Sequence, residues 1–319
     1  MRLKAYIAII CIQIASMIFL FFQIKHKSNN TLGVSVNIIN SKTIKKSPMS
    51  EFKYFYEPKR NTIEKVNEWG PYKGTYTINN DSLNERYNYS GNKERNVFRI
   101  ITLGDSYTYG LYVDTKDNWT EVLEDKLQGL SCDKKIEVIN LGVQGYDPAY
   151  EVERYKLRGT KYDPNLIIWF LIDPDRISES IYEIMQKNHD KLVKQGVNIN
   201  SYDPWNLAWE EVLKIYGEKG IYKHQLDALR KINKLYIGKI LFIVQKTESL
   251  TKPFPYMYEF KNERANTEIH EIISIYDKPR LHFPQDYHPN IEGHKAIAED
   301  VFNYLKKSKL IPSGCEPSG

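Results

Sequence analysis

Two groups of residues in this sequence have types and a spacing that suit catalysis. One is a serine that directly follows an apolar run predicted to be a buried strand, and the other is an aspartate–histidine pair near the C-terminus. The serine is Ser106, the last residue of a Gly-Asp-Ser tripeptide. Asp286 and His288 are two positions apart, so in an extended segment their side chains point to one side and Tyr287 points away. Asp286 would then hold one ring nitrogen of His288 and leave the other for the Ser106 hydroxyl. This arrangement predicts nucleophilic catalysis on an acyl group.

Each of these segments also has an ordinary structural explanation when it is taken alone. Gly-Asp-Ser is typical of turns and helix caps. His288 would equally suit the start of a helix, where it caps or fills space, and Asp286 would then be a turn residue. The motif also differs from the nucleophile elbow Gly-x-Ser-x-Gly, because Thr108 takes the place of the second glycine. The position of Ser106 directly after a strand is what favours chemistry.

Alternating strands and helices must position these residues. Short apolar, β-branched runs predict four buried strands, at 97–103, 136–141, 166–172 and 239–245. Apolar residues at helical spacing predict helices at 118–130, 149–159 and 293–306. This alternation indicates an α/β fold with a central parallel sheet and right-handed crossovers. Ser106 then lies at the carboxyl end of a strand, where such sheets bind ligands and helix N–H groups can face a developing oxyanion.

Four segments, in this order along the chain, resemble the sequence blocks of the SGNH/GDSL hydrolases. They are GDSYTYG (104–110), IEVINLGVQGYDPAYE (136–151), LIIWFLIDPDRI (166–177) and DYHPNIEGH (286–294). The resemblance implies a three-layer α/β/α fold of the SGNH/flavodoxin-like kind. It also implies a serine esterase, lipase or acyltransferase.

Carried over by position, the resemblance gives roles to individual residues. Ser106 is the nucleophile, His288 the general base and acid, and Asp286 the residue that orients His288. The backbone N–H groups of Ser106 and Gly142 are the expected oxyanion-hole donors. Asp105, also in the first block, is expected to support the loop instead of taking part in chemistry.

One position departs from the family pattern. The third block usually carries an asparagine, whose side chain donates to the oxyanion, directly before an aspartate. Here Ile172 precedes Asp173, and isoleucine has no donor. Loss of one such donor costs on the order of 10²–10³ in rate. Gln144 is the nearest side chain that can replace it.

No metal or cofactor is expected. His282 and His294 flank the acid–histidine pair, but their spacing fits no familiar zinc pattern, and a structural hydrogen bond is the simpler role for His294. Cysteines occur at positions 11, 132 and 315, without a Cys-x-x-Cys spacing. Cys132 and Cys315 lie outside the apolar N-terminal run, and the sequence leaves open whether they pair.

The N-terminal part reads as a membrane anchor and a stalk. Residues 5–24 carry no charge and would span a bilayer as a helix. We therefore expect an anchor at 1–27 and a polar stalk at 28–50, with the catalytic part outside the cytoplasm. Basic residues occur on both sides of the span, so the positive-inside rule does not fix this orientation.

The remaining chain is expected to form one main domain with an appendage. Residues 51–96 read as a small irregular or hairpin element packed on it, and 97–310 as the SGNH-hydrolase-like domain. Its insertion at about 174–238, mostly helical in pattern, either caps the site and sets specificity or packs on one face of the sheet.

Composition narrows the function. The formal net charge of +5 comes without a long Lys/Arg run, so no nucleic-acid partner is expected. The 24 tyrosines suit sugar stacking, although a compositional bias would give the same number. The resemblance to SGNH/GDSL hydrolases implies hydrolysis of carboxylic esters, O-acetyl groups above all, on a carbohydrate or a lipid. The alternatives are an O-acyltransferase acting on a cell-surface glycan, or a catalytically weak binding module, which Ile172 favours.

Overall fold

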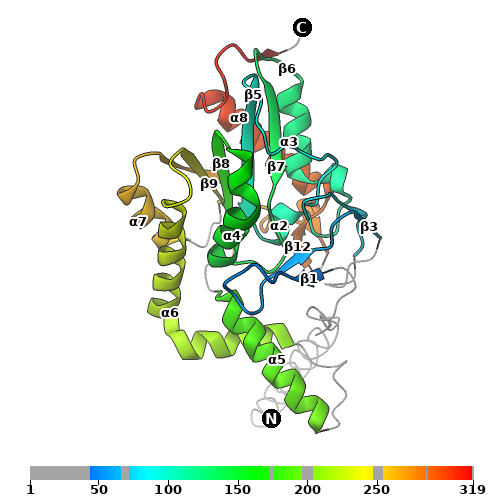
Figure 1. Ribbon diagram of the computed structural model, residues 1–319, viewed down its shortest axis with the longest axis vertical. Coiled ribbons are helices and arrows are strands. Elements are labelled where there is room, and N and C mark those ends of the chain that lie inside the picture. The colour runs from blue at the N-terminus through cyan, green and yellow to red at the C-terminus, as the bar shows by residue number, and fades with distance from the viewer. Residues whose placement is uncertain are drawn as a thin grey trace, which may run out of the picture.

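A five-stranded parallel sheet forms the centre of the protein (Figure 1). The computed structural model describes residues 44–65, 72–172, 176–195, 204–246, 254–284 and 286–317. The strand order is β10-β9-β8-β5-β7, and each neighbouring pair is parallel. The strands are β5 (Val97–Gly104), β7 (Lys135–Asn140), β8 (Leu166–Leu171), β9 (Lys239–Gln245) and β10 (Thr267–Ile272).

Helices cover both faces of this sheet. One face packs against α4, the second half of α6, and α7, and the other packs against α3 and α8. The strands β8 and β9 are almost wholly buried, as strands covered on both faces must be. The three-layer α/β/α class predicted from the sequence is therefore confirmed. The helices are α3 (Trp119–Gln128), α4 (Pro148–Arg154), α6 (Pro204–Ile232), α7 (Pro255–Glu263) and α8 (Ile291–Lys307).

The predicted elements lie close to the observed ones, with two differences. The predicted helix at 149–159 is divided into α4 and a π-helical turn, Tyr155–Gly159. The edge strand β10 was not predicted, because its sequence, TEIHEI, has neither a continuous apolar run nor a regular alternation, and only its two end residues are buried. Single 3₁₀ turns cover Thr115–Asp117, Thr160–Tyr162 and Pro279–Leu281.

The appendage before the sheet consists of two short antiparallel pairs. β1 (Ile44–Lys46) pairs with β2 (Tyr56–Pro58), and β3 (Thr62–Glu64) pairs with β4 (Tyr76–Ile78). β4 packs its apolar side chains on residues that follow Ser106. The expected stalk boundary at residue 50 needs correction: residues 44–50 already belong to the folded part, because β1 is hydrogen-bonded to β2.

The insertion after β8 forms two long helices. α5 (Ser178–Lys194) packs against the first arm of α6, which runs up to a bend at Gly217. Gly217 has φ +60° and ψ 173°, a conformation that essentially only glycine adopts. The second arm then turns onto the sheet, so α6 has an L shape (Figure 1).

Several short elements complete the described chain. Two small antiparallel pairs join β11 to β12 and β6 to β13, and a disulfide between Cys132 and Cys315 lies beside the second pair. The expected membrane span at 5–24 lies outside the described residues, and no helix within the described ranges is long and apolar enough to cross a bilayer. The short elements are α2 (Ser106–Tyr109), β6 (Leu130–Ser131), β11 (His282–Phe283), β12 (Asp286–Pro289) and β13 (Glu316–Pro317).

Candidate active site

The segment after β5 presents Ser106 as the first residue of the short helix α2. Asp105 caps this helix: its Oδ1 accepts a hydrogen bond from the Tyr107 backbone N–H at 3.0 Å. Gly104 has φ +152°, and a Cβ at this position would lie 2.2 Å from Thr108 Oγ1. The close contact between Gly104 and Thr108 explains why a glycine ends the strand where the chain turns into α2.

The acid–histidine segment is the strand β12, which pairs with β11. Asn290 fixes its far end: Nδ2 donates to the His282 carbonyl at 3.1 Å, and Oδ1 accepts from the Gly293 N–H at 3.0 Å, which caps α8. The Tyr107 hydroxyl donates to the Tyr287 carbonyl at 2.5 Å. This last bond joins the nucleophile segment directly to the acid–histidine segment.

The structure brings Ser106, His288 and Asp286 into one hydrogen-bonded chain. His288 Nε2 lies 2.7 Å from Ser106 Oγ, and His288 Nδ1 lies 2.5 Å from Asp286 Oδ1. Burial opposes ionisation of Asp286, but hydrogen bonds from His288 and Tyr112 outweigh it and lower the pKa of this carboxyl. Asp286 is therefore a carboxylate at neutral pH, which orients His288 with its Nε2 toward the serine.

The expected oxyanion donor Gly142 requires a correction. Its backbone N–H donates to Asn140 Oδ1 at 2.8 Å, so it is already engaged. A Cβ at Gly142 would lie 2.5 Å from the Tyr109 backbone nitrogen, so this glycine is required for packing against α2. Asn140 holds the same contact by donating from Nδ2 to the Thr108 carbonyl at 2.9 Å.

Gly145, three residues further on, is a candidate for the role expected of Gly142. It lines the same cavity as Ser106, and its φ of +76° turns the chain. Within the described part of the chain, neither the Gly145 N–H nor the Ser106 N–H donates a hydrogen bond. Ser178 Oγ donates to the Gly145 carbonyl at 3.0 Å and fixes the orientation of this peptide. Two uncommitted amides on a rigid frame suit an oxyanion hole.

Ile172 lines the cavity, so the departure from the family pattern is present at the site itself. Gln144 also lines it, and its side-chain amide forms no hydrogen bond with the described residues. The Gln144 side chain therefore stays a candidate for a third donor. Sequence reasoning missed two further polar side chains of this cavity, Arg176 and Asn206.

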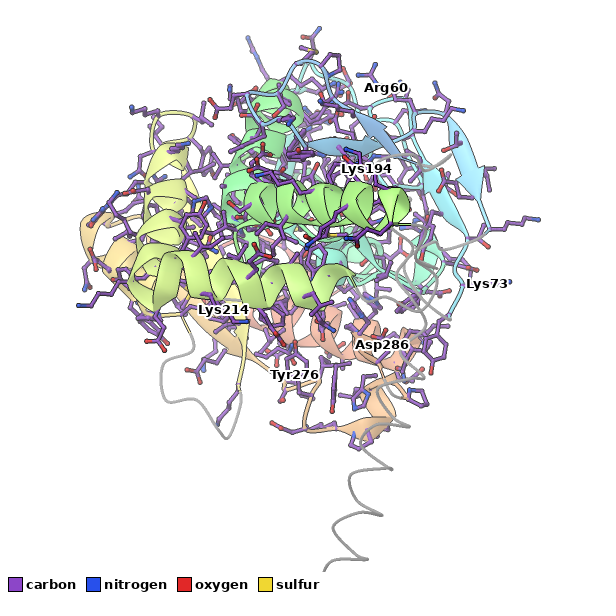
Figure 2. All side chains as sticks on the ribbon, turned by 90° about the horizontal axis from the view of Figure 1, so that it is seen from below. Arg60, Lys73, Lys194, Lys214, Tyr276 and Asp286 are labelled. Carbon is purple, nitrogen blue, oxygen red and sulfur yellow. A yellow bond between two sulfur atoms is a disulfide. The ribbon has the colours of Figure 1, made fainter. Side chains whose placement is uncertain are left out.

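The cavity has a volume of about 450 Å³ and mixes the triad with aromatic side chains. Trp205 and Trp209 come from the first arm of α6, so the insertion does form one wall of the site. Figure 2 shows Tyr276 and Asp286 beside this arm of α6. The lining residues are Ser106, Tyr107, Leu111, Tyr112, Gln144, Gly145, Ile172, Arg176, Trp205, Asn206, Trp209, Tyr276, Asp286, Tyr287 and His288.

Arg176 connects the nucleophile segment to this wall. Its Nη2 lies 2.8 Å from Asp105 Oδ2, and both side chains are buried. Its guanidinium lies 5.9 Å from the centre of the Trp205 ring. The charge of Arg176 thereby offsets that of Asp105. Asp105 itself holds the segment around Ser106 through its hydrogen bond from the Tyr107 N–H.

The two flanking histidines take no part in this chain of hydrogen bonds. His294 is buried on α8, and its Nδ1 accepts from the Trp119 N–H at 3.2 Å. Burial lowers the pKa of His294 to about 3, so it stays neutral and structural. The described residues contain no group of three or more His, Cys, Asp or Glu side chains that could hold a metal ion.

Comparisons with known proteins find similar folds only among solved structures. No family model and no curated protein matches the sequence. The esterase EstA from Pseudoalteromonas sp. is 13% identical, with a TM-score of 0.43 over 67% of this chain and 99% of that one. A lipolytic protein of the G-D-S-L family from Desulfitobacterium hafniense is 15% identical, with a TM-score of 0.39 over 65% and 99%. The acetylxylan esterase Axe2 from Geobacillus stearothermophilus is 12% identical, with a TM-score of 0.40 over 66% and 93%.

These identities concern the fold alone. The role of each residue in this chain rests on its own geometry.

Proposed function

We propose that this protein is a serine ester hydrolase with Ser106 as nucleophile. The observation that carries the proposal is the hydrogen-bonded chain from Ser106 through His288 to Asp286, which opens into a cavity beside two uncommitted backbone amides. A capping or space-filling histidine needs neither a serine at 2.7 Å nor a cavity.

The geometry supports a two-step reaction. His288 Nε2 takes the proton of Ser106 as Oγ attacks the ester carbonyl, and the Ser106 and Gly145 amides stabilise the oxyanion. The oxyanion collapses, the C–O bond to the alcohol breaks, and His288 returns its proton to that oxygen. Water then attacks the acyl-serine with His288 as base, which releases the acid and restores the Ser106 hydroxyl.

For the substrate, we propose an O-acetylated carbohydrate. The support is the set of aromatic rings around the nucleophile, with Trp205 and Trp209 on the α6 wall and Tyr276 and Tyr287 near the triad. The C–H faces of a pyranose ring are apolar and suit flat aromatic surfaces, whereas its hydroxyl groups need a polar partner such as Asn206. The volume of about 450 Å³ lies in the range of small-ligand sites.

Hydrolysis of an activated acetate ester by the full-length chain tests the proposal. We expect turnover by the wild type, a loss of about 10³-fold or more in Ser106→Ala, and no loss in the matched control Ser90→Ala, whose serine is exposed. Equal turnover in Ser106→Ala would contradict the esterase assignment.

Acyl transfer to a sugar hydroxyl is the second candidate. It is favoured by the position of Trp205 and Trp209, because a wall provided by the inserted helices reduces the access of water to the acyl-enzyme. Added acceptor oligosaccharide would then divert the product from free acetate to a new ester. Unchanged acetate release at saturating acceptor would exclude this reaction for that acceptor.

We also propose that the catalytic domain lies outside the cytoplasm, anchored through residues 5–24. The Cys132–Cys315 disulfide supports this location, since such bonds persist in oxidising compartments. Mass spectrometry of the protein isolated from its native cells, alkylated before lysis, measures the state of both cysteines. Two alkylated thiols would contradict the proposed location.

A further inference from the structure

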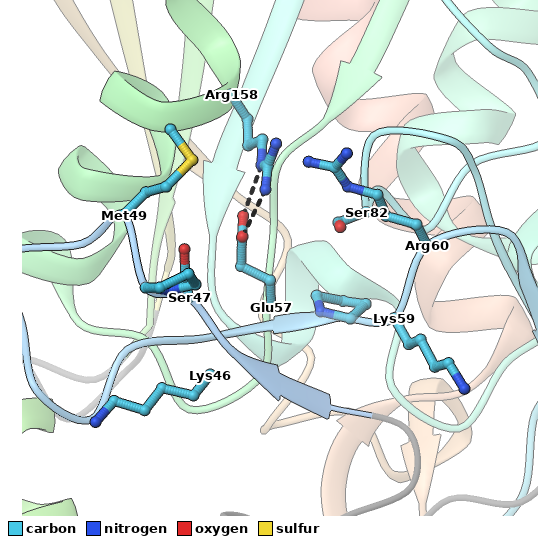
Figure 3. A pocket seen from close by; sticks show the side chains of 10 residues that line it. Lys46, Ser47, Met49, Glu57, Lys59, Arg60, Ser82 and Arg158 are labelled. Atoms are coloured by element: carbon cyan, nitrogen blue, oxygen red, sulfur yellow. Dashed lines mark hydrogen bonds and ion pairs between the residues drawn. The ribbon is translucent and has the colours of Figure 1, made fainter.

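A second cavity, of about 410 Å³, lies over the appendage (Figure 3), and none of its lining residues belongs to the triad. The strand β2 forms its floor, and the turn after β1 and the π-helical turn contribute its sides. The lining residues are Lys46, Ser47, Pro48, Met49, Glu57, Pro58, Lys59, Arg60, Ser82 and Arg158.

The carboxylate in this cavity is already neutralised. Glu57 is buried, Arg158 binds it through Nε at 2.8 Å and Nη2 at 2.7 Å, and Arg154 binds it from behind. Burial alone would raise the pKa of Glu57, but Arg154 and Arg158 outweigh it and lower that pKa to about 2. Glu57 is therefore ionised and fully paired, and its charge is not available to the other cations around the cavity.

Three further cations line the cavity. Lys46, Lys59 and Arg60 are exposed, and their side chains form no ion pair or hydrogen bond with any residue of the described ranges. Figure 3 shows the guanidinium groups of Arg60 and Arg158 facing the same space, with Lys46 and Lys59 extending from the edge. With four cations and one carboxylate, the lining has a positive potential that attracts anions.

The walls between these charges are apolar. Pro48 and Pro58 are stiff, and Met49 is 70% exposed although it lines a hollow. We propose that this cavity binds an acidic sugar unit of a glycan, with its carboxylate or phosphate on the cations and its ring against the proline and methionine walls. A concave site with cations on several sides suits a compact anionic unit better than a flat membrane surface.

The strand β2 joins this cavity to the Ser106 site. Glu57 points into the cation cavity, whereas the hydroxyl of the preceding residue, Tyr56, donates to the Gln144 carbonyl. The Tyr56 hydroxyl also lies 2.5 Å from the Tyr182 hydroxyl. Because Gln144 lines the Ser106 cavity, a glycan bound over β2 would lie on the strand that contacts the wall of that cavity. The second site would thus tether an acidic polymer near the proposed esterase site.

Binding is measured on the full-length chain carrying Ser106→Ala, so that the result does not depend on ester hydrolysis. The probes are trigalacturonic acid, the neutral maltotriose, inorganic phosphate and vesicles of phosphatidylglycerol. The test variant is Lys46→Gln/Lys59→Gln/Arg60→Gln. The matched control is Lys214→Gln/Lys234→Gln/Lys307→Gln, which removes the same charge from exposed lysines elsewhere.

We expect trigalacturonic acid to bind, to bind more weakly as salt rises, and to lose about tenfold or more in affinity in the test variant only. Equal binding by test and control variants would overturn the proposal. Equally tight binding of maltotriose or phosphate would overturn the acidic-sugar assignment, and binding of vesicles alone would replace it with a lipid site. When Ser106 is left intact, the Lys46→Gln/Lys59→Gln/Arg60→Gln variant should hydrolyse a small acetate ester at the wild-type rate. Failure of the proposed binding site and failure of the proposed esterase are therefore distinguishable.

Discussion

The two cavities are similar in volume, at about 450 and 410 Å³, but differ in whether their charged side chains form ion pairs. Around Ser106 the principal charged groups are paired: Asp286 with His288, and Arg176 with Asp105. In the second cavity Lys46, Lys59 and Arg60 have no partner among the described residues. Paired charges fix side chains for chemistry, whereas unpaired ones attract an ion from outside. We interpret this contrast as the difference between the proposed esterase site and the proposed anion-binding site.

The largest expected effect is the loss of kcat when the hydrogen-bonded chain of the Ser106 site is broken. His288→Ala removes the base, so kcat for ester hydrolysis should fall by about 10⁴-fold with little change in KM. The matched control is His282→Ala, which removes an imidazole from the neighbouring strand β11 but not from the triad. Comparable losses in both variants would show that only the fold of this segment matters.

A second effect concerns the oxyanion donors. Gly145→Ala should lower kcat by about 10²–10³-fold, because a Cβ would lie 2.4 Å from the Tyr182 hydroxyl and shift the amide. Gln144→Ala retains this backbone and should cost about tenfold if the side chain replaces the missing asparagine. Unchanged activity in Gln144→Ala would exclude its side chain as a donor. Unchanged activity in Gly145→Ala would exclude the Gly145 N–H as an oxyanion donor.

The paired carboxylate of the second cavity should matter for stability instead of catalysis. At neutral pH, Glu57→Gln should lower the free energy of unfolding by about 3 kcal/mol, because it removes the carboxylate that pairs with the buried Arg154 and leaves Arg158 with only the longer contact to Asp81. The pKa of Glu57 is lowered from 4.5 to about 2 in the folded state, so its contribution is complete above about pH 5 and is lost as the pH falls toward 2. Urea unfolding of both proteins across this range measures the difference, and a difference independent of pH would contradict the ion-pair explanation.

The smallest expected effect concerns the aromatic wall. Trp209→Ala should raise KM for an acetylated oligosaccharide by about tenfold, whereas Trp209→Phe should retain most of the affinity. Neither variant should change the hydrolysis of a small activated acetate. An equal loss on both substrates would indicate a structural role for Trp209.

Local patterns in the sequence predict which residues form the hydrogen-bonded chain at Ser106. The extended Asp286-to-His288 spacing and the strand before Ser106 are short-range features, and the structure brings all three residues together. The resemblance alone does not decide whether the N–H of Gly142 or that of Gly145 is the better candidate for the oxyanion donor. Asn140 stands two residues before Gly142, a spacing at which an asparagine side chain often accepts the backbone N–H, and this signal would have excluded Gly142.

Other features depend on contacts between distant parts of the chain. The position of the α6 wall follows from the bend at Gly217, which a helical pattern does not reveal. The second cavity combines residues near positions 46–60 with Ser82 and Arg158, so no sequence window contains it. In the sequence, Lys46, Lys59 and Arg60 look like ordinary basic residues. Only the structure shows that they have no ion-pair partner among the described residues.

Trapping the acyl-enzyme tests the central claim most directly. The full-length chain is mixed with excess activated acetate ester, quenched in acid within the first turnovers, digested and analysed by mass spectrometry. We predict one acetyl group on the peptide that contains Ser106, and none in Ser106→Ala. Acetylation of another residue at the same rate, or turnover without any acetylated Ser106, would contradict a serine nucleophile in this fold.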